Sequence, residues 1–179
     1  MSKQKITPVD QELTFSPDEI IVSKTDPTGK ILYANDVFCR LAEMNTSDVV
    51  GQPHSIIRHP DMPRAVFKLL WDSIGSGREI FALIKNMSAT GKYYWVVAHV
   101  TPSRDGAGKV LGYHSNRRAP NRASVQEIIP LYQELKAEEA KHTDRRAGLE
   151  ASFALLQSKL KATGKSYDEF IWGVGGSNV

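Results

Sequence analysis

Cysteine is almost absent from this sequence, which holds one such residue, Cys39, among 179. A single thiol excludes an internal disulfide and any metal site built from several cysteines. The sequence also has no dense run of lysine and arginine, and its formal net charge is only +3. Residues 121–179 hold eight basic and eight acidic side chains, so the small excess lies in residues 1–120. This charge pattern argues against a nucleic-acid-binding protein.

Long apolar stretches are missing as well. The N-terminus shows no signal-peptide-like segment, and no run approaches the roughly 20 residues needed to cross a bilayer. We therefore expect a cytoplasmic protein in a reducing compartment. No G-x-S-x-G elbow, H-E-x-x-H pair or P-loop is present, which argues against an enzyme. The length suits one domain of ordinary size with an appended element.

The first part of the sequence predicts a hairpin followed by short helices. Residues 1–17 are polar and aperiodic, and we expect them to form a flexible arm. Residues 19–36 contain two β-branched runs around Asp-Pro-Thr-Gly, which is typical of a β-hairpin. Asn35 or Asp36 can cap the helix that follows. Apolar residues at helical spacing predict a further helix over Pro63–Ile74.

From Arg78 the period of the apolar residues changes from about 3.6 to 2. Residues 78–86, 92–102 and 109–118 are three strand candidates joined by short glycine-containing connections. Two strands, several short helices and three strands predict an α+β domain, with a five-stranded antiparallel sheet and its helices on one face. Neither face of these strands alternates cleanly, so we expect terminal segments or a protein partner to cover the second face.

The C-terminal part has the composition of helices. Apolar residues at heptad-like spacing over residues 149–160 predict a pair of helices with an apolar seam, and Pro130 should start or kink a helix. An apolar tail around Phe170 and Trp172 can dock onto the core or contact a partner. We divide the chain into a flexible arm, a central α+β domain and a C-terminal helical segment with its tail, namely residues 1–17, 18–119 and 120–179.

The sequence Arg-His-Pro-Asp-Met-Pro forms a proline-stiffened corner before the predicted helix. Arg58 offers a planar fork of donors that suits a phosphate or a ring carbonyl. His59 can donate to the same anion, and Asp61 can orient either side chain or accept from a sugar hydroxyl. Pro60 and Pro63 restrict the backbone states that binding would otherwise have to freeze. The spacing alone favours a capping and salt-bridge arrangement over a binding site.

Three further side chains are candidates for contact with a ligand. Phe67 and Trp71 lie one helical turn apart and can form a wall beside a planar ring, although such pairs commonly belong to a core. Asn86 shares a strand face with Ile80 and Ile84. A buried amide needs hydrogen-bond partners, which a polar ligand edge or an ordinary strand-end turn can supply.

The predicted order of strands and helices is that of a PAS sensor domain. Four stretches, YAN, GQPHSIIRHPDMP, FKLLW and YYWV, resemble the flavin-binding PAS domain of bacterial aerotaxis and energy-taxis receptors. The resemblance runs from about Ile20 to Arg118 and continues into IIPLYQELK. With its short helical tail, the chain is most similar to the soluble, PAS-only energy-taxis proteins.

This resemblance implies a redox and energy sensor that holds FAD without a covalent bond. It also implies a membrane-bound chemoreceptor-type signalling protein as the partner, with a homodimer as a further assembly. Many relatives carry Trp where this chain has Ile80, a departure that leaves room for FMN. The resemblance implies that Arg58, His59 and Asp61 bind the cofactor. The helix and strand patterns add Phe67, Trp71 and Asn86 as further cofactor-binding candidates.

Other functions fit parts of the sequence. A haem-binding PAS oxygen sensor would need a pocket histidine as iron ligand, and the candidates are His54, His59, His99 and His114. A PAS domain without ligand would act as a protein-interaction scaffold. A small flavin oxidoreductase is the enzyme alternative. Covalent flavin photochemistry is not expected, because Cys39 lies in an early helix where a small buried residue is the ordinary choice.

Overall fold

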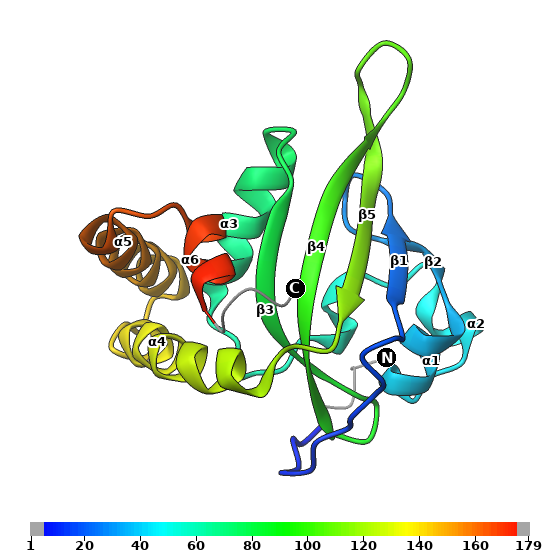
Figure 1. The fold of residues 1–179 in the computed structure, drawn as a ribbon, viewed down its shortest axis with the longest axis horizontal. Coiled ribbons are helices and arrows are strands. Elements are labelled where there is room, and N and C mark those ends of the chain that lie inside the picture. Colours follow the sequence, from blue (N-terminus) through cyan, green and yellow to red (C-terminus); the bar gives the residue numbers. More distant parts are fainter. Residues whose placement is uncertain (1–5, 175–179) are drawn as a thin grey trace.

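The computed structural model describes residues 6–174 and contains a five-stranded antiparallel sheet in the order β2-β1-β5-β4-β3 (Figure 1). This confirms the predicted α+β fold and the predicted sheet. Five of the six boundaries of the last three strands differ by one or two residues from the sequence pattern, because a strand ends where its ladder of backbone hydrogen bonds ends. The strands are β1 Ile21–Thr25, β2 Ile31–Ala34, β3 Ile80–Met87, β4 Tyr93–Arg104 and β5 Val110–Arg118.

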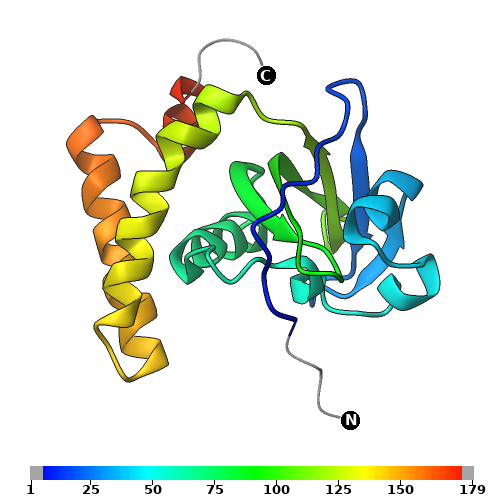
Figure 2. The same cartoon turned by 90° about the horizontal axis from the view of Figure 1, so that it is seen from below.

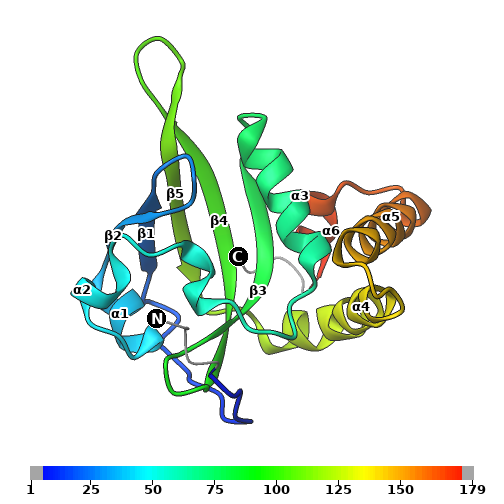
Figure 3. The same ribbon diagram turned by 180° about the vertical axis from the view of Figure 1, so that it is seen from behind.

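Short helices cover one face of this sheet, as predicted (Figure 3). Asn35 caps the first of them, because its Oδ1 accepts from the amide of Phe38 at 3.1 Å. The same oxygen accepts from the amide of Val22 at 3.0 Å, which fastens the helix to β1. The elements between β2 and β3 are α1 Asp36–Ala42, α2 Thr46–Val49, the 3-10 helix η1 His54–Ile57 and α3 Arg64–Gly75.

Three helices, where the sequence pattern predicts two, follow the sheet (Figures 1 and 2). The three are α4 Arg122–Ala140, which contains Pro130, α5 Arg145–Thr163 and α6 Tyr167–Gly173. Helices α4 and α6 contact the β3 edge of the sheet, and α5 packs against α4 and α3. Tyr132 donates its hydroxyl to the carbonyl of Leu83 at 2.7 Å, and Asp168 accepts from the amide of Phe81 at 3.1 Å. These bonds occupy backbone groups that an exposed edge strand would leave open. No described helix is both long and apolar enough to span a membrane.

The N-terminal segment differs from the expected flexible arm in the part that the structure describes, residues 6–17. The amide of Val9 donates to the carbonyl of Gly91 at 2.9 Å, and the amide of Leu13 donates to the carbonyl of Tyr93 at 2.7 Å. Tyr93 in turn donates to the carbonyl of Gln11 at 3.0 Å. Backbone pairing with the start of β4 therefore holds this polar segment, which periodicity alone could not show.

Helix α3 begins at a terminus that a distant residue caps. Pro63 precedes it and offers no side-chain cap. The Oε1 atom of Glu139, on α4, instead accepts from the amides of Arg64 at 2.6 Å and Ala65 at 3.3 Å, and its Oε2 accepts from Arg64 Nε at 3.0 Å. Glu139 is only 5% exposed. A buried carboxylate therefore satisfies the free amides of α3 and ties it to the C-terminal helices.

Replacing Glu139 by Gln keeps the shape of the side chain but removes the charge from these bonds. We expect the free energy of unfolding to fall by about 1.5–3 kcal/mol, the usual contribution of hydrogen bonds to a charged group. Urea unfolding measures this. The matched control is Glu138→Gln, whose partner Lys141 lies on the exposed helix surface, and it should lose less than about 1 kcal/mol. Equal losses in the two variants would contradict the assigned role of Glu139.

Candidate functional site

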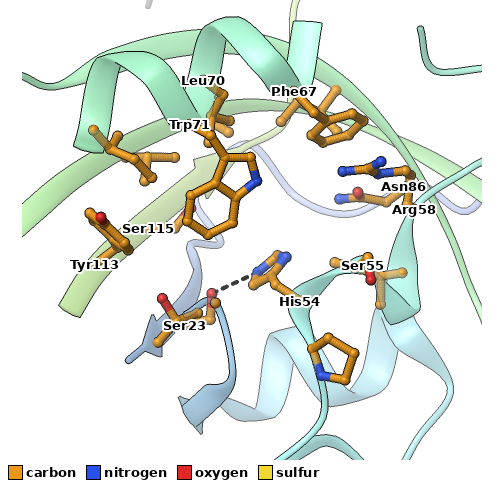
Figure 4. Close-up of a pocket in the computed structure, with 18 of the residues that line it drawn as sticks. Ser23, His54, Ser55, Arg58, Phe67, Leu70, Trp71, Asn86, Tyr113 and Ser115 are labelled. Atoms are coloured by element: carbon orange, nitrogen blue, oxygen red, sulfur yellow. Dashed lines mark hydrogen bonds between the residues drawn. The ribbon is translucent and has the colours of Figure 1, made fainter. Parts of the chain in front are cut away.

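A cavity of about 410 Å³ lies between α3, the η1 segment and the inner face of the sheet (Figure 4). This volume falls within the range of small-molecule sites. One wall comes from α3, where four apolar side chains repeat at helical spacing and face the sheet. Opposite them, small and branched residues of β3 and β4 form an apolar floor. The apolar lining consists mainly of Phe67, Leu70, Trp71, Ile74, Ile84, Ala98 and Val100.

Arg58 and Asn86 form one polar end of the cavity. Their backbones pair in an antiparallel bridge, which brings both side chains to the same place (Figure 4). The guanidinium of Arg58 lies 3.5 Å from the centroid of the Phe67 ring, a cation–π contact. Asn86 is 4% exposed. An arginine and an amide are therefore held side by side against an aromatic wall.

Arg117 of β5 provides a second polar group. Its side chain is 2% exposed, and its Nη2 donates to Ser23 Oγ at 2.7 Å and to His54 Nε2 at 2.5 Å. A guanidinium has only donors, so His54 Nε2 must be an acceptor and its proton must lie on Nδ1. Burial, followed by the charge of Arg117, lowers the pKa of His54 to about 3. The imidazole is therefore neutral at physiological pH.

The cavity lining contains buried donors without partners. Among the described residues, Arg58 Nε, Ser115 Oγ and Arg117 Nη1 are buried and make no hydrogen bond. Burial lowers the pKa of Arg117 to about 10, which leaves it charged at neutral pH. No Asp or Glu lines the cavity. Buried donors normally have acceptors, so this arrangement suits a planar apolar molecule with an anionic or acceptor-rich edge.

The residues expected to bind a cofactor separate into two groups. Arg58, Phe67, Trp71 and Asn86 line the cavity, whereas His59 and Asp61 do not. His59 Nδ1 accepts from the amide of Asp61 at 3.1 Å, and mainly burial lowers the pKa of His59. The carboxylate of Asp61 binds Lys85 Nζ at 2.7 Å. A neutral His59 and a paired Asp61 therefore fasten the corner to β3, while Arg58 faces the cavity.

The structure also adds site residues that sequence reasoning missed. Tyr113, Ser115 and Arg117 occupy alternate positions of β5 and so share one face. That alternation is a signal in the sequence, but it identifies an inner face only once the register with β4 is known. Ser23 is another missed residue, and the sequence suggests His54 only as a haem ligand. The two come together through their bonds to Arg117 and to each other.

The alternatives meet specific obstacles in this geometry. Of the four histidines considered as haem ligands, only His54 lines the cavity, and its Nε2 already accepts from Arg117. Cys39 lies in α1, outside the cavity lining, with Thr46 Oγ1 3.6 Å from its sulfur. A cysteine in this place cannot form an adduct with a ring bound in the cavity.

The fold and this cavity together define a sensory domain of the PAS type. Residues 31–117 match a protein-family model described as the PAS fold. This part of the chain therefore belongs to the PAS-fold family, and sequence comparison confirms the resemblance to an aerotaxis receptor.

The aerotaxis receptor of Escherichia coli (strain K12) is 34% identical over 128 residues, which cover 71% of this chain and 25% of that protein. Phototropin-1A of Oryza sativa subsp. japonica is 29% identical over 91 residues, covering 51% of this chain and 10% of that protein. The chain thus spans a quarter or less of the length of these two relatives. A solved structure from work on a flavin analogue and the mechanism of light-oxygen-voltage domains superimposes with a TM-score of 0.54 at 20% identity. The superposition covers 69% of this chain and 87% of the chain in that structure, and it supports the fold.

The buried charge of Arg117 gives a prediction for the protein without ligand. In Arg117→Met, Ser23 and His54 can bond to each other, and a buried cation without a carboxylate partner disappears. We expect the free energy of unfolding of the flavin-free protein to stay unchanged or rise by roughly 1 kcal/mol or more, as measured in urea. Arg118→Met, at the exposed neighbouring position, should stay within about 0.5 kcal/mol. A clear loss of stability in Arg117→Met alone would show that this charge stabilises the fold.

Proposed function

We propose that this chain is a redox sensor that binds FAD in the cavity of its PAS domain and relays the redox state to a chemoreceptor-type signalling partner. The observation that carries the proposal is the set of buried, partnerless donors on Arg58, Ser115 and Arg117 facing an apolar slot. The charge of a redox cofactor differs between its oxidised and reduced forms, and such donors can bind one form more strongly than the other. The resemblance to aerotaxis receptors implies the same cofactor.

The lining fits the two edges of an isoalloxazine ring. Phe67, Leu70 and Trp71 can lie along the apolar ring system, and Asn86 can bond a polar edge that both donates and accepts. Bound flavin would supply electron acceptance and release, with added negative charge on the ring in the reduced form. The positive charge of Arg117 would stabilise that reduced form, because no acidic side chain in the cavity lining offsets it.

Strand β3 offers a route from the cavity to the C-terminal helices. Asn86 faces the cavity, and on the same strand Leu83 accepts from Tyr132 of α4 while Phe81 donates to Asp168 of α6. A change in the bonds at Asn86 would act on the strand that these helices hold. We infer that reduction of the flavin shifts the equilibrium between two arrangements of α4 and α6 on β3.

The partner is proposed from the relationship to a protein named as an aerotaxis receptor. A membrane-bound chemoreceptor-type protein would then receive the signal from a cytoplasmic chain, either from one copy or from a homodimer. We propose a sensor and not an enzyme. Oxidation of reduced nicotinamide in the presence of an electron acceptor, at a rate that depends on the protein, would contradict this.

One observation favours a scaffold without ligand as the second candidate. The indole of Trp71 extends across the cavity toward Tyr113, with ring centroids 5.7 Å apart at an interplanar angle of 80° (Figure 4). It is 38% exposed. In the flavin-binding protein this side chain would have to swing aside or stack on the ring, whereas in a scaffold it would remain where it lies.

The cofactor itself is the first measurement. Full-length protein is purified from cells supplied with flavin and haem precursors, its visible spectrum is taken, and the released small molecule is identified by chromatography after denaturation. The two-band spectrum of an oxidised flavin and release of FAD would support the proposal. Release of FMN would overturn the choice of dinucleotide, a Soret band would indicate haem, and a colourless protein without affinity for added flavin would favour the scaffold.

Arg58→Ala tests the arginine at the polar end of the cavity. We expect the dissociation constant for FAD to rise about tenfold or more, because a charge-assisted contact is lost, while the fold remains. Calorimetric titration of flavin-free protein measures the affinity, and circular dichroism checks the fold. Arg40→Ala is the matched control, since Arg40 pairs with Glu19 outside the cavity. Equal affinities in the two variants would remove Arg58 from the site.

A further inference from the structure

A second hollow, here called the hairpin cleft, shares Arg58 with the cavity. It has a volume of about 500 Å³ and lies between the proline corner and the turn that joins α4 to α5. Figure 3 shows the α4–α5 pair beside α3, which starts at that corner. The charged and titratable side chains that matter in its lining are Arg58, Arg64, Lys136, Glu139, His142 and Arg145.

The charge in this cleft is strongly unbalanced. Four of its side chains are lysine or arginine, and Glu139 is the single carboxylate in the lining. Both oxygens of Glu139 already accept from Arg64 and from the first amides of α3. Lys136 Nζ stays 3.9 Å from the nearer oxygen. The one acid therefore neutralises Arg64 and leaves the other cations of the cleft with little compensation.

Acidic groups at the rim do not alter this balance. Asp61 lies near enough to Lys136 to interact with it, but its carboxylate is bound to Lys85 at 2.7 Å. Glu138, near the C-terminal end of α4, pairs with Lys141 at 2.6 Å and is 3.5 Å from His142. The negative charge around the cleft is thus already committed to other cations.

Arg58 and Arg145 are the two cations of the cleft that form no ion pair with a described residue. The guanidinium of Arg58 lies on the Phe67 ring, and its Nε is buried without any hydrogen bond. Burial, and then the charge of Arg145, lower the pKa of Arg58. Two guanidinium groups that repel each other across a cleft lower the stability of the fold unless an anion lies between them.

We propose that the hairpin cleft binds the diphosphate of a flavin dinucleotide whose ring lies in the cavity, with Arg145 and Lys136 of the C-terminal helices as phosphate ligands. This inference rests on the proposed flavin function and extends the site beyond the PAS domain. Arg58 stands at the boundary, where it can contact the start of the phosphate chain.

The residue types suit this ligand. A guanidinium can bind phosphate oxygens through two parallel bonds, and a lysine adds a mobile point charge. A flavin without phosphate would end at the cavity, and a single phosphate could reach Arg58 alone. A dinucleotide continues past Arg58, so only it brings anionic oxygens to α4 and α5. Binding would then select FAD over shorter flavins and fasten the C-terminal helices to the corner.

The test compares three flavins on flavin-free, full-length protein by calorimetric titration. We expect Arg145→Ala to raise the dissociation constant for FAD about tenfold and to leave that for riboflavin unchanged. Arg146→Ala is the matched control, because Arg146 is 85% exposed, pairs with Glu150 and lies outside the cleft lining. FMN should bind Arg145→Ala and the parent protein with similar affinity.

A second pair of variants uses the lysines. Lys136→Ala should weaken FAD alone, whereas Lys141→Ala, on the exposed side, should bind all three flavins as the parent does. If riboflavin and FAD bind the parent protein equally, or if Arg145→Ala and Arg146→Ala bind FAD equally, the cleft does not hold the diphosphate and the flavin proposal stands. If no flavin binds, the proposed function fails and this inference fails with it.

Discussion

The guanidinium of Arg117 lies in the protein interior without a carboxylate beside it, and the site is organised around that charge. It receives partial compensation from Ser23 and His54, two groups brought together from β1 and η1. The same contact keeps His54 neutral and fixes its tautomer. One Arg117 nitrogen remains without a partner at the cavity wall. A protein of marginal stability retains such a feature at a cost, which an anionic or acceptor ligand would offset.

Strand β3 connects that site to the C-terminal helices, because its inner face lines the cavity and its backbone edge is bonded to α4 and α6. Its inner face contributes Ile84 and Asn86 to the cavity. Its backbone at Phe81 and Leu83 holds α6 and α4 through one hydrogen bond each. An edge strand with few neighbours on one side is easier to displace than a central one, because fewer ladder bonds resist the movement. The proposed signal route therefore runs through an edge strand that also carries cavity residues.

The sequence allowed the sheet, the first hairpin and α3 to be predicted, because alternation, turn residues and helical spacing are local signals. Four of the residues that it singles out lie together in the lining of one cavity, namely Arg58, Phe67, Trp71 and Asn86. The different orientation of His59 and Asp61 depends on Lys85, 24 positions further along the chain than Asp61. The cap that Glu139 gives to α3 spans 75 positions. No periodicity within a short window contains such information, and the site role of Arg117 depends on strand register in the same way.

The C-terminal helices influence the site through the cap at α3, although Glu139, which forms this cap, does not line the cavity. Glu139 occupies the amides at the start of α3, so that helix terminus is not available to a phosphate, and a ligand must use side chains instead. Those side chains are available because Glu139 compensates Arg64 and leaves Arg58 and Arg145 without an ion pair. The same residue thus positions the wall of the cavity, holds the α4–α5 turn next to the corner and leaves the neighbouring cleft positive. Changes in the docking of these helices and changes in ligand binding would therefore be coupled in both directions, as linkage requires.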